Sequence, residues 1–197
     1  MMVPNARHFD QTWVVHSLNQ GFELEDVWEF PIKAGPQHNL EQFRECFQRV
    51  FERLETEGIS GFLFRLRFFL GQIFGWDKQP PIRNIMRAGS LRERYVVSGH
   101  GHLPDPETGD RLPFEWVYRL PDEYLSEIDN KTCHAALHLG WVPLGEGRYT
   151  VRMAVYVKPH GRLGRFYMAL IKPFRRWIVY PAMMRLAARE WRKVTEP

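Results

Sequence analysis

Two rows of ionisable side chains in the second half of the chain have the residue types for chemistry. Glu123, Glu127 and Asp129 form the first row, and carboxylates that face inward can act as general acids or bases. His134 and His138 form the second. In a strand they would share one face but lie roughly 13 Å apart, too far to bind one metal without a further ligand. Each row has two interpretations, solvated residues on a wet face or polar residues that line a cavity.

A third polar group lies in the sequence SGHGHLPD. His100 and His102 flank a glycine, and Asp105 follows. Two imidazoles and a carboxylate are ligands that a transition metal accepts, but a polar loop also has this composition without binding one. We therefore predict no metal and no cofactor.

Composition limits the class of protein. A chain of 197 residues with 44% hydrophobic residues can form one globular domain with a core. Cys46 and Cys133 stand in apolar patterns, and charges interrupt the first thirty residues where a secretory signal needs an apolar run. The most apolar stretch, residues 61–76, contains Arg65 and Arg67 and is too short to span a membrane. We expect a cytoplasmic protein with reduced thiols.

The net charge of +4 is unevenly distributed. Residues 161–197 contain nine Lys and Arg and two Glu, a net charge of +7, whereas the first 160 residues contain 18 basic and 21 acidic residues, a net charge of −3. A basic end is either a solvated helix face or a surface for an anionic membrane or an acidic protein. No nucleic-acid-binding motif is present, and the aromatic residues here lie opposite the charges, so we predict no nucleic-acid partner.

The elements that must position these residues begin with the C-terminal segment. Residues 161–192 predict one long amphipathic helix. Pro173 and Pro181 predict kinks near residues 169–173 and 177–181, because proline lacks the backbone donor. The apolar stripe of this helix consists of Leu163, Phe166, Tyr167, Leu170, Phe174, Trp177, Ile178, Met184, Ala188 and Trp191. Arg165, Lys172 and Arg176 fall opposite the stripe.

The distal part of this helix is apolar nearly all round. Val179, Met183, Leu186 and Ala187 fall on the side that is basic earlier in the helix. Such a helix needs a further contact. We leave three open: a second copy in a homodimer, residues 62–74 of the same chain, or a membrane surface.

The remaining elements alternate or repeat with clear periods. Asn39 is a predicted N-cap for a helix that ends at Gly58, and a second helix is predicted over residues 61–76. Alternating apolar residues and short turns predict antiparallel neighbouring strands, of which one sheet face is dry. The predicted strands are 22–33, a short one at 94–98, 113–120, 123–130, 132–143 and 148–159.

Together these elements predict an α+β fold. A first strand and two helices precede a curved antiparallel sheet, and the C-terminal helix covers the dry face. Residues 1–20 show no strong period and form a predicted lead-in segment, followed by a single domain over residues 21–197.

This order of elements resembles the helix-grip fold of the START and pollen-allergen-like superfamily, also called SRPBCC. Three stretches, SGFLFRLRFFLGQIFGWD, DEYLSEIDNKTCHAALHLGWV and YTVRMAVYVKPHGRLGRFYMALIKPFRRWIVYPAMMR, are similar to the domain-of-unknown-function family 2867. Where family members often have a histidine after the Pro-Phe pair, this chain has Arg175. The resemblance implies a cavity between the sheet and the C-terminal helix, without an assigned reaction.

Three functions follow as hypotheses. The first is a helix-grip domain that binds an apolar or amphipathic small molecule in that cavity. The second is a peripheral membrane or partner-docking module that uses the basic C-terminal helix, and the third is a small cyclase- or dehydratase-like enzyme with polar residues in the cavity. The candidate ligand-binding residues, which a filled core would equally explain, are Trp116, Tyr118, Leu137, Met153, Phe166, Leu170, Phe174 and Trp177.

Overall fold

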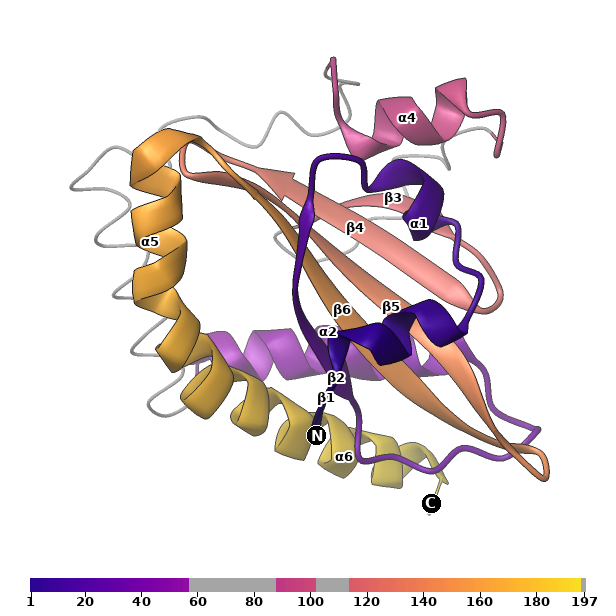
Figure 1. Cartoon of the computed structure of the whole chain (residues 1–197). Helices are drawn as coiled ribbons and strands as arrows, with labels where there is room; N and C mark the ends of the chain where they lie inside the picture. Colours follow the sequence, from indigo (N-terminus) through magenta and orange to yellow (C-terminus); the bar gives the residue numbers. More distant parts are fainter. Residues whose placement is uncertain (57–87, 102–113, 196–197) are drawn as a thin grey trace.

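The computed structural model describes residues 1–56, 88–101 and 114–195. Within them, six strands form one antiparallel sheet in the order β1-β2-β6-β5-β4-β3 (Figure 1). The predicted α+β class is confirmed, with helices on both faces of a curved sheet. The strands are β1 Met2–Val3, β2 Glu23–Glu29, β3 Glu115–Arg119, β4 Glu123–Asp129, β5 Cys133–Gly145 and β6 Arg148–Pro159. The helices are the 3-10 helix η1 Asn5–Asp10, α1 Val15–Leu18, α2 Leu40–Thr56, α4 Leu91–Val97, α5 Gly161–Phe174, the π-helix η2 Arg175–Val179 and α6 Tyr180–Thr195.

The dry face of the sheet is covered by α2 and α6. Asn39 caps α2, because its side-chain oxygen accepts a hydrogen bond from the Gln42 N–H at 3.0 Å and the Gln42 side chain accepts one from the Asn39 N–H at 3.1 Å. The apolar stripe of α2 then buries Phe43 and Phe47 against the sheet and α6. Burial of each such ring contributes about 1.5–3 kcal/mol. The C-terminal helix therefore covers the dry face, as predicted, and does so through α6.

The C-terminal helix changes its winding between its two prolines. The segment Arg175–Val179 is π-helical and separates α5 from α6, and the helix axis bends in this region (Figure 1). Prolines remove backbone donors from the regular ladder, which favours such an irregular turn. We expected two kinks at the prolines; the structure has one π-helical segment between them.

The distal part of the helix packs on its own chain. Met183 and Ala187 are buried in the core beneath the sheet, and Leu186 packs partly buried against the same core. The aromatic ring of Trp191 lies 5.9 Å from that of Phe43. The apolar residues around the distal part of the helix are thus covered by helix α2 and the sheet. The homodimer through this part of the helix stays a prediction.

Helix α5 turns a different side toward the sheet than the one we expected. Its buried residues are Gly164, Tyr167 and Met168. A Cβ on Gly164 would lie 2.1 Å from the carbonyl oxygen of Thr132, so the missing side chain permits the closest approach of α5 to the β4–β5 turn. This approach fixes the rotation of the helix. The expected inward orientation is therefore wrong for Phe166, Leu170, Phe174 and Trp177, which are exposed.

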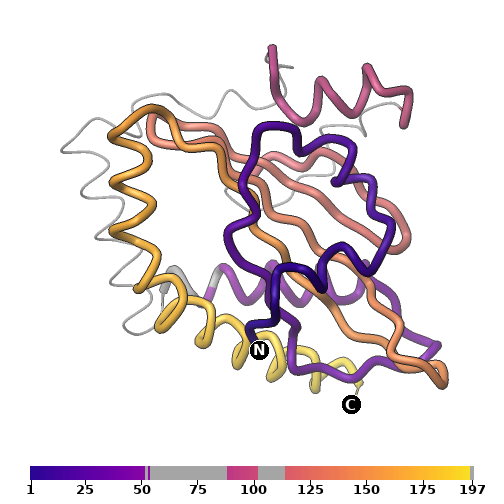
Figure 2. The backbone as a smooth tube through the Cα atoms, viewed as in Figure 1, coloured from indigo at the N-terminus to yellow at the C-terminus, as the bar shows by residue number. Residues whose placement is uncertain are grey.

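The opposite face of the sheet is covered by the N-terminal segment and α4 (Figure 2). Residues 1–20, which lack a clear period, contain β1, η1 and α1; β1 pairs with β2, and Trp13, Val15 and Leu18 enter a second apolar core. This second core also contains buried Glu123, Glu127, His134, His138 and Arg152, which makes the face wetter than the first, as predicted.

The strand predicted over residues 94–98 is wrong, because this segment is in helix α4. The Ser90 hydroxyl accepts a hydrogen bond from the Glu93 N–H at 3.1 Å and caps the helix. The predicted helix over 61–76, the loops that follow it, His102 and Asp105 lie outside the described residues. Among the described helices, none has the length and apolar character required to cross a bilayer.

Candidate functional site

Each carboxylate of the predicted row contacts a histidine. Glu123 lies 3.0 Å from Nε2 of His138, and Glu127 lies 2.6 Å from Nε2 of His134. Asp129 contacts His160 at 2.8 Å. The first two pairs form because β4 and β5 are antiparallel with Leu125 opposite His138 and Asp129 opposite His134, so each glutamate is diagonal to its histidine on one face. The Glu123 and Glu127 pairs are buried, and the Asp129 pair is partly exposed.

Glu123 is the centre of the first buried pair. Its carboxylate accepts hydrogen bonds from the Val14 N–H at 2.7 Å, the Tyr118 hydroxyl at 2.9 Å and His138 Nε2 at 3.0 Å. Burial alone would raise the pKa of Glu123, but these hydrogen bonds and the electrostatic interaction with His138 outweigh it and hold the pKa below its usual range. Burial and the neighbouring carboxylate raise the pKa of Tyr118. The site therefore contains an ionised Glu123 and a neutral Tyr118 at neutral pH.

Two aromatic side chains from the N-terminal segment, His8 and Trp13, pack against the ring of His138, and a third, His16, packs against His8. The ring centroid of His138 lies 5.1 Å from that of His8 and 5.3 Å from that of Trp13, and His8 lies 5.0 Å from His16. The strand β5 accommodates Trp13 because it has Gly140 there; a Cβ on Gly140 would lie 2.7 Å from the indole ring. The cluster of His8, Trp13, His16 and His138, together with Glu123 and Tyr118, is named the His–Glu cluster below.

Several ring nitrogens of this cluster have no hydrogen-bond partner among the described residues. His138 Nδ1, both ring nitrogens of His8, His16 Nε2 and Trp13 Nε1 are buried without a hydrogen-bond partner among the described residues. A buried polar group without a hydrogen bond costs about 1–3 kcal/mol, and several such groups side by side are rare in folded proteins. Their convergence in one place makes the cluster the candidate site.

The two N-terminal histidines are neutral at physiological pH. Burial, followed by the nearby His138, His16 and Arg152, lowers the pKa of His8 from 6.5 to about 2. Burial also lowers the pKa of His16. A neutral imidazole has one donor nitrogen and one acceptor nitrogen. The cluster can therefore donate hydrogen bonds to a ligand and accept them from it.

The cluster reaches the surface through the N-terminal segment. His16 is only half-buried, and its ring lies 5.0 Å from that of the exposed Phe9. Ser17, the next residue, contacts the exposed His100 at 3.4 Å. The row of rings from His138 through His8 to His16 thus connects the buried glutamate with the surface.

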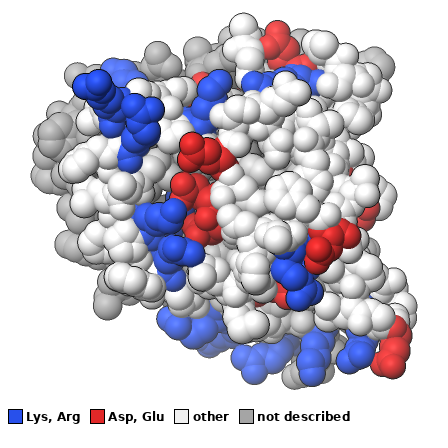
Figure 3. All heavy atoms as spheres, viewed as in Figure 1, with Lys and Arg blue, Asp and Glu red and all other residues white. Residues whose placement is uncertain are grey.

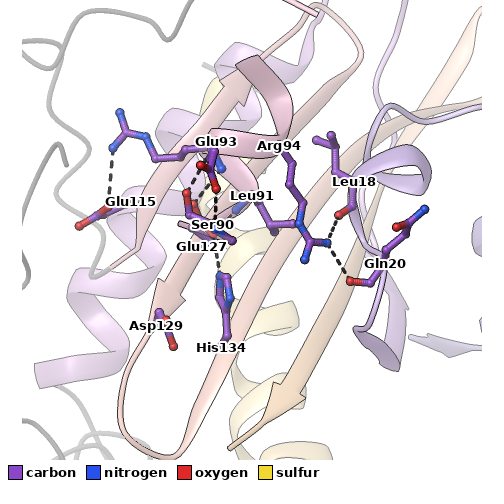
Figure 4. A network of polar contacts seen from close by, with 12 residues as sticks. Leu18, Gln20, Ser90, Leu91, Glu93, Arg94, Glu115, Glu127, Asp129 and His134 are labelled. Atoms are coloured by element: carbon purple, nitrogen blue, oxygen red, sulfur yellow. Dashed lines mark hydrogen bonds and ion pairs between the residues drawn. The ribbon is translucent and has the colours of Figure 1, made fainter. Parts of the chain in front are cut away.

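The second buried pair has a different environment. Glu127 accepts hydrogen bonds from the backbone N–H groups of Leu91 at 2.8 Å and Arg92 at 3.1 Å, at the start of α4 (Figure 4). Arg94 of the same helix donates to the carbonyls of Leu18 and Gln20, both at 2.7 Å (Figure 4). Glu127 therefore anchors α4 to the sheet, and Arg94 joins the same helix to the N-terminal segment.

The predicted apolar ligand residues are divided over three environments. Trp116, Leu137 and Met153 are buried in the core beneath α2 and α6. Tyr118 lies in the second core, on the opposite face, and donates to Glu123. Phe166, Leu170, Phe174 and Trp177 are exposed on α5 and η2. The structure does not bring these eight residues together at one place.

Sequence reasoning missed the contributions of His8, Trp13 and His16. No spacing in residues 1–20 indicates that His8 and Trp13 meet His138, or that His16 packs against His8, because these contacts depend on how the N-terminal segment crosses the sheet. The Glu–His pairs had a usable signal, since the tight turn at residues 130–132 sets the register of β4 and β5. In the described parts of the chain, no three His, Cys, Asp or Glu side chains are placed to hold a metal ion.

Comparisons with known proteins identify a family but no activity. A family model described as "Protein of unknown function (DUF2867)" matches residues 18–182. No curated protein and no solved structure matches the chain. The match confirms the predicted family and covers both glutamates of the buried pairs with their histidines, whereas His8, Trp13 and His16 precede it. Placement in the wider SRPBCC superfamily is compatible with the fold and stays a prediction.

Proposed function

We propose a function for this chain, which belongs to the family described as protein of unknown function (DUF2867), from its His–Glu cluster. The cluster binds a small polar molecule and transfers a proton to or from it. This corresponds to the hypothesis of a small enzyme with polar residues in its interior. The reaction class is acid–base chemistry, such as isomerisation, dehydration or cyclisation of a compound with an acidic proton.

One observation carries the proposal: the two nitrogens of His138 differ. Nε2 is held at 3.0 Å by Glu123, and Nδ1 is buried with no hydrogen-bond partner in the described part of the chain. A carboxylate on one nitrogen orients the imidazole and stabilises the imidazolium that forms when the other nitrogen accepts a proton. Nδ1 of His138 is therefore the proposed base, and Glu123 is the residue that positions it.

The neighbouring donors suit the charge that such a step creates. When the substrate loses a proton to Nδ1, its electron pair stays on the substrate as negative charge. The imidazolium then returns a proton to the substrate, either the same proton or one that has exchanged with water. Trp13 Nε1–H and the N–H of neutral His8 lie beside His138 and can donate hydrogen bonds to that charge. The substrate class is thus a small compound in which a carbonyl or carboxylate oxygen receives the charge.

Binding is tested first, with protein purified from its source cells. Native mass spectrometry detects a retained small molecule, and NMR of protein with 15N-labelled histidines follows the ring nitrogens before and after its removal. We expect removal to shift the resonances of His138 and His8 and to leave those of His134 unchanged. Absence of a retained molecule, together with no shift on addition of acetate or cyclohexanone, would contradict binding at the cluster.

Proton transfer is tested with a matched pair of variants. Exchange of the α-protons of the bound molecule, or of cyclohexanone, with deuterium from solvent is measured by NMR. The variant His138→Gln should lose on the order of a hundredfold in exchange rate, whereas His134→Gln, which breaks the other buried pair, should retain it. Equal loss in both variants would show that the effect arises from stability and would contradict the proposal.

Binding of an apolar or amphipathic molecule between the sheet and the C-terminal helix is the other small-molecule hypothesis. It has less support, because its eight residues lie on both faces of the sheet and on the exposed side of α5. A retained lipid-like molecule in the same mass spectra, with unchanged histidine resonances, would favour it over proton transfer.

A further inference from the structure

The exposed side of α5 carries a continuous apolar stripe. Leu163, Phe166, Leu170 and Phe174 follow one another at helical spacing, and Trp177 continues the stripe into η2. The exposed fraction is 66% for Phe166 and 79% for Trp177. Exposed apolar surface of this extent on one helix indicates an interaction site, because single scattered residues are usual and contiguous ones are not.

Basic residues border the stripe. Arg162 precedes Phe166 by one turn, and Arg165, Lys172 and Arg176 form a neighbouring row. Arg162 and Arg165 are exposed and form no ion pair with any carboxylate in the described residues, whereas Lys172 and Arg176 pair with Glu25 and Asp26 at 3.2 and 3.1 Å. Figure 3 shows basic side chains over the α5 side of the molecule and along α6.

We propose that α5 docks on the surface of an anionic lipid bilayer. The helix lies parallel to the membrane, the rings of Phe166, Phe174 and Trp177 enter the boundary between headgroups and acyl chains, and Arg162 and Arg165 contact anionic headgroups. An apolar face with Trp and Phe beside a face rich in Lys and Arg is the composition of interfacial helices. Tryptophan prefers this boundary because it combines a large apolar ring with one polar N–H.

Two other occupants fit the stripe less well. A second copy packed antiparallel about a two-fold axis would place the basic row of one protomer beside the basic row of its partner, and like charges repel. A small apolar molecule is too short, because Leu163 and Trp177 are about 21 Å apart along the helix. This inference uses residues outside the His–Glu cluster and does not depend on the proton-transfer proposal.

Binding to vesicles tests the proposal with the full chain. Sedimentation with phosphatidylcholine vesicles that contain phosphatidylserine should remove the protein from solution, and pure phosphatidylcholine should bind it weakly. The double variant Arg162→Glu/Arg165→Glu should lose on the order of tenfold or more in affinity. The matched control Arg185→Glu/Arg189→Glu has the same change in net charge on exposed residues of α6 and should lose less. Equal losses would contradict a site on α5.

The apolar contact has its own readout. Vesicles with brominated acyl chains should quench tryptophan fluorescence of the wild type, and the variant Trp177→Phe should lose most of this quenching while binding remains. The variant Phe166→Ser/Trp177→Ser should lose vesicle binding with an unchanged unfolding midpoint, because both side chains are exposed. Persistent binding of this variant, or wild-type dimers that the same change converts to monomers, would overturn the proposal.

Discussion

Two buried Glu–His pairs have their glutamates four residues apart on β4, and they differ in the groups around them. From the residues that the structure describes, Glu123 and Glu127 each accept three hydrogen bonds, one of them from a histidine on β5. The other two donors to Glu127 are backbone N–H groups of α4, whereas Glu123 binds one backbone N–H and the Tyr118 hydroxyl. The two carboxylates thus have the same number of partners but hold different parts of the fold.

The second nitrogen of each histidine separates the two pairs further. Among the residues that the structure describes, Nδ1 of His138 is buried without a hydrogen-bond partner beside the nitrogens of His8 and Trp13, whereas His134 has no such buried, unpartnered nitrogen. The ring of His134 instead packs against Phe22, with centroids 4.8 Å apart. A buried Glu–His pair alone therefore does not mark a candidate site, because the other nitrogen of the histidine must also be left for a ligand.

The largest effect on the free energy of unfolding is expected from Glu127→Ala. This change leaves the Leu91 and Arg92 N–H groups and His134 without their buried acceptor, and we expect a loss of about 3–5 kcal/mol in the free energy of unfolding. Urea unfolding measures the loss, and hydrogen exchange should show the loss of protection concentrated in α4. A loss below about 1 kcal/mol, or one without an effect on α4, would mean that Glu127 is not an anchor.

A smaller effect on the free energy of unfolding, one that depends on pH, is expected from His8→Phe. The pKa of His8 is about 2 in the folded protein and 6.5 in the unfolded chain, so below pH 6.5 the unfolded chain binds a proton that the folded protein rejects. The wild type should therefore lose stability as the pH falls, by about 2 kcal/mol at pH 5 relative to neutral pH. The variant should lack this contribution. Urea unfolding of the wild type and the variant at pH 5 and at neutral pH measures how the free energy of unfolding of each protein changes with pH.

The control for His8→Phe is His100→Gln, which changes an exposed histidine. It should keep the wild-type pH dependence. If His8→Phe keeps it as well, His8 titrates normally, and the description of the cluster as a neutral, buried environment is wrong. Glu123 also makes low pH unfavourable, since its pKa is lowered, but this contribution is common to all three proteins.

The smallest effect is expected from Asp129→Asn, which breaks the third pair. Asp129 and His160 lie at the ends of β4 and β6, where water competes for both groups. An ion pair of this exposure contributes about 0–1 kcal/mol. Urea unfolding should therefore show a change below about 1 kcal/mol. A larger loss would mean that burial is not what separates this pair from those of Glu123 and Glu127.

The sheet and its main core could be predicted from the sequence because they depend on local periodicity. Alternation in residues 132–143 and 148–159 correctly assigned β5 and β6, and helical spacing correctly assigned α2. Helix α4 was misread as a strand because Tyr95, Val96 and Val97 favour strands. The Ser90-x-x-Glu93 capping signature, which could have corrected the assignment, is equally local.

The candidate site could be predicted only in part, because it depends on contacts between distant residues. Glu123 and His138 carried recognisable residue types, but their pairing follows from strand register. His8 and Trp13 enter through the path of the N-terminal segment, which no period predicts. The rotation of α5 about its axis could not be predicted either, because an apolar stripe on a helix does not show which side faces the sheet. The side that faces the sheet is the one with Gly164, which permits the close approach.

The position of β2 has a consequence for synthesis of the protein. β2 lies between β1 and β6 in the sheet, so the N-terminal residues leave the ribosome long before the strand that supports them. His8 and Trp13 cannot reach their final places until β5 and β6 have emerged, because His138 and Gly140 lie on β5. Such long-range pairing slows folding. Nascent chains that stop before β5 would therefore contain the N-terminal half of the proposed site without the strand on which it assembles.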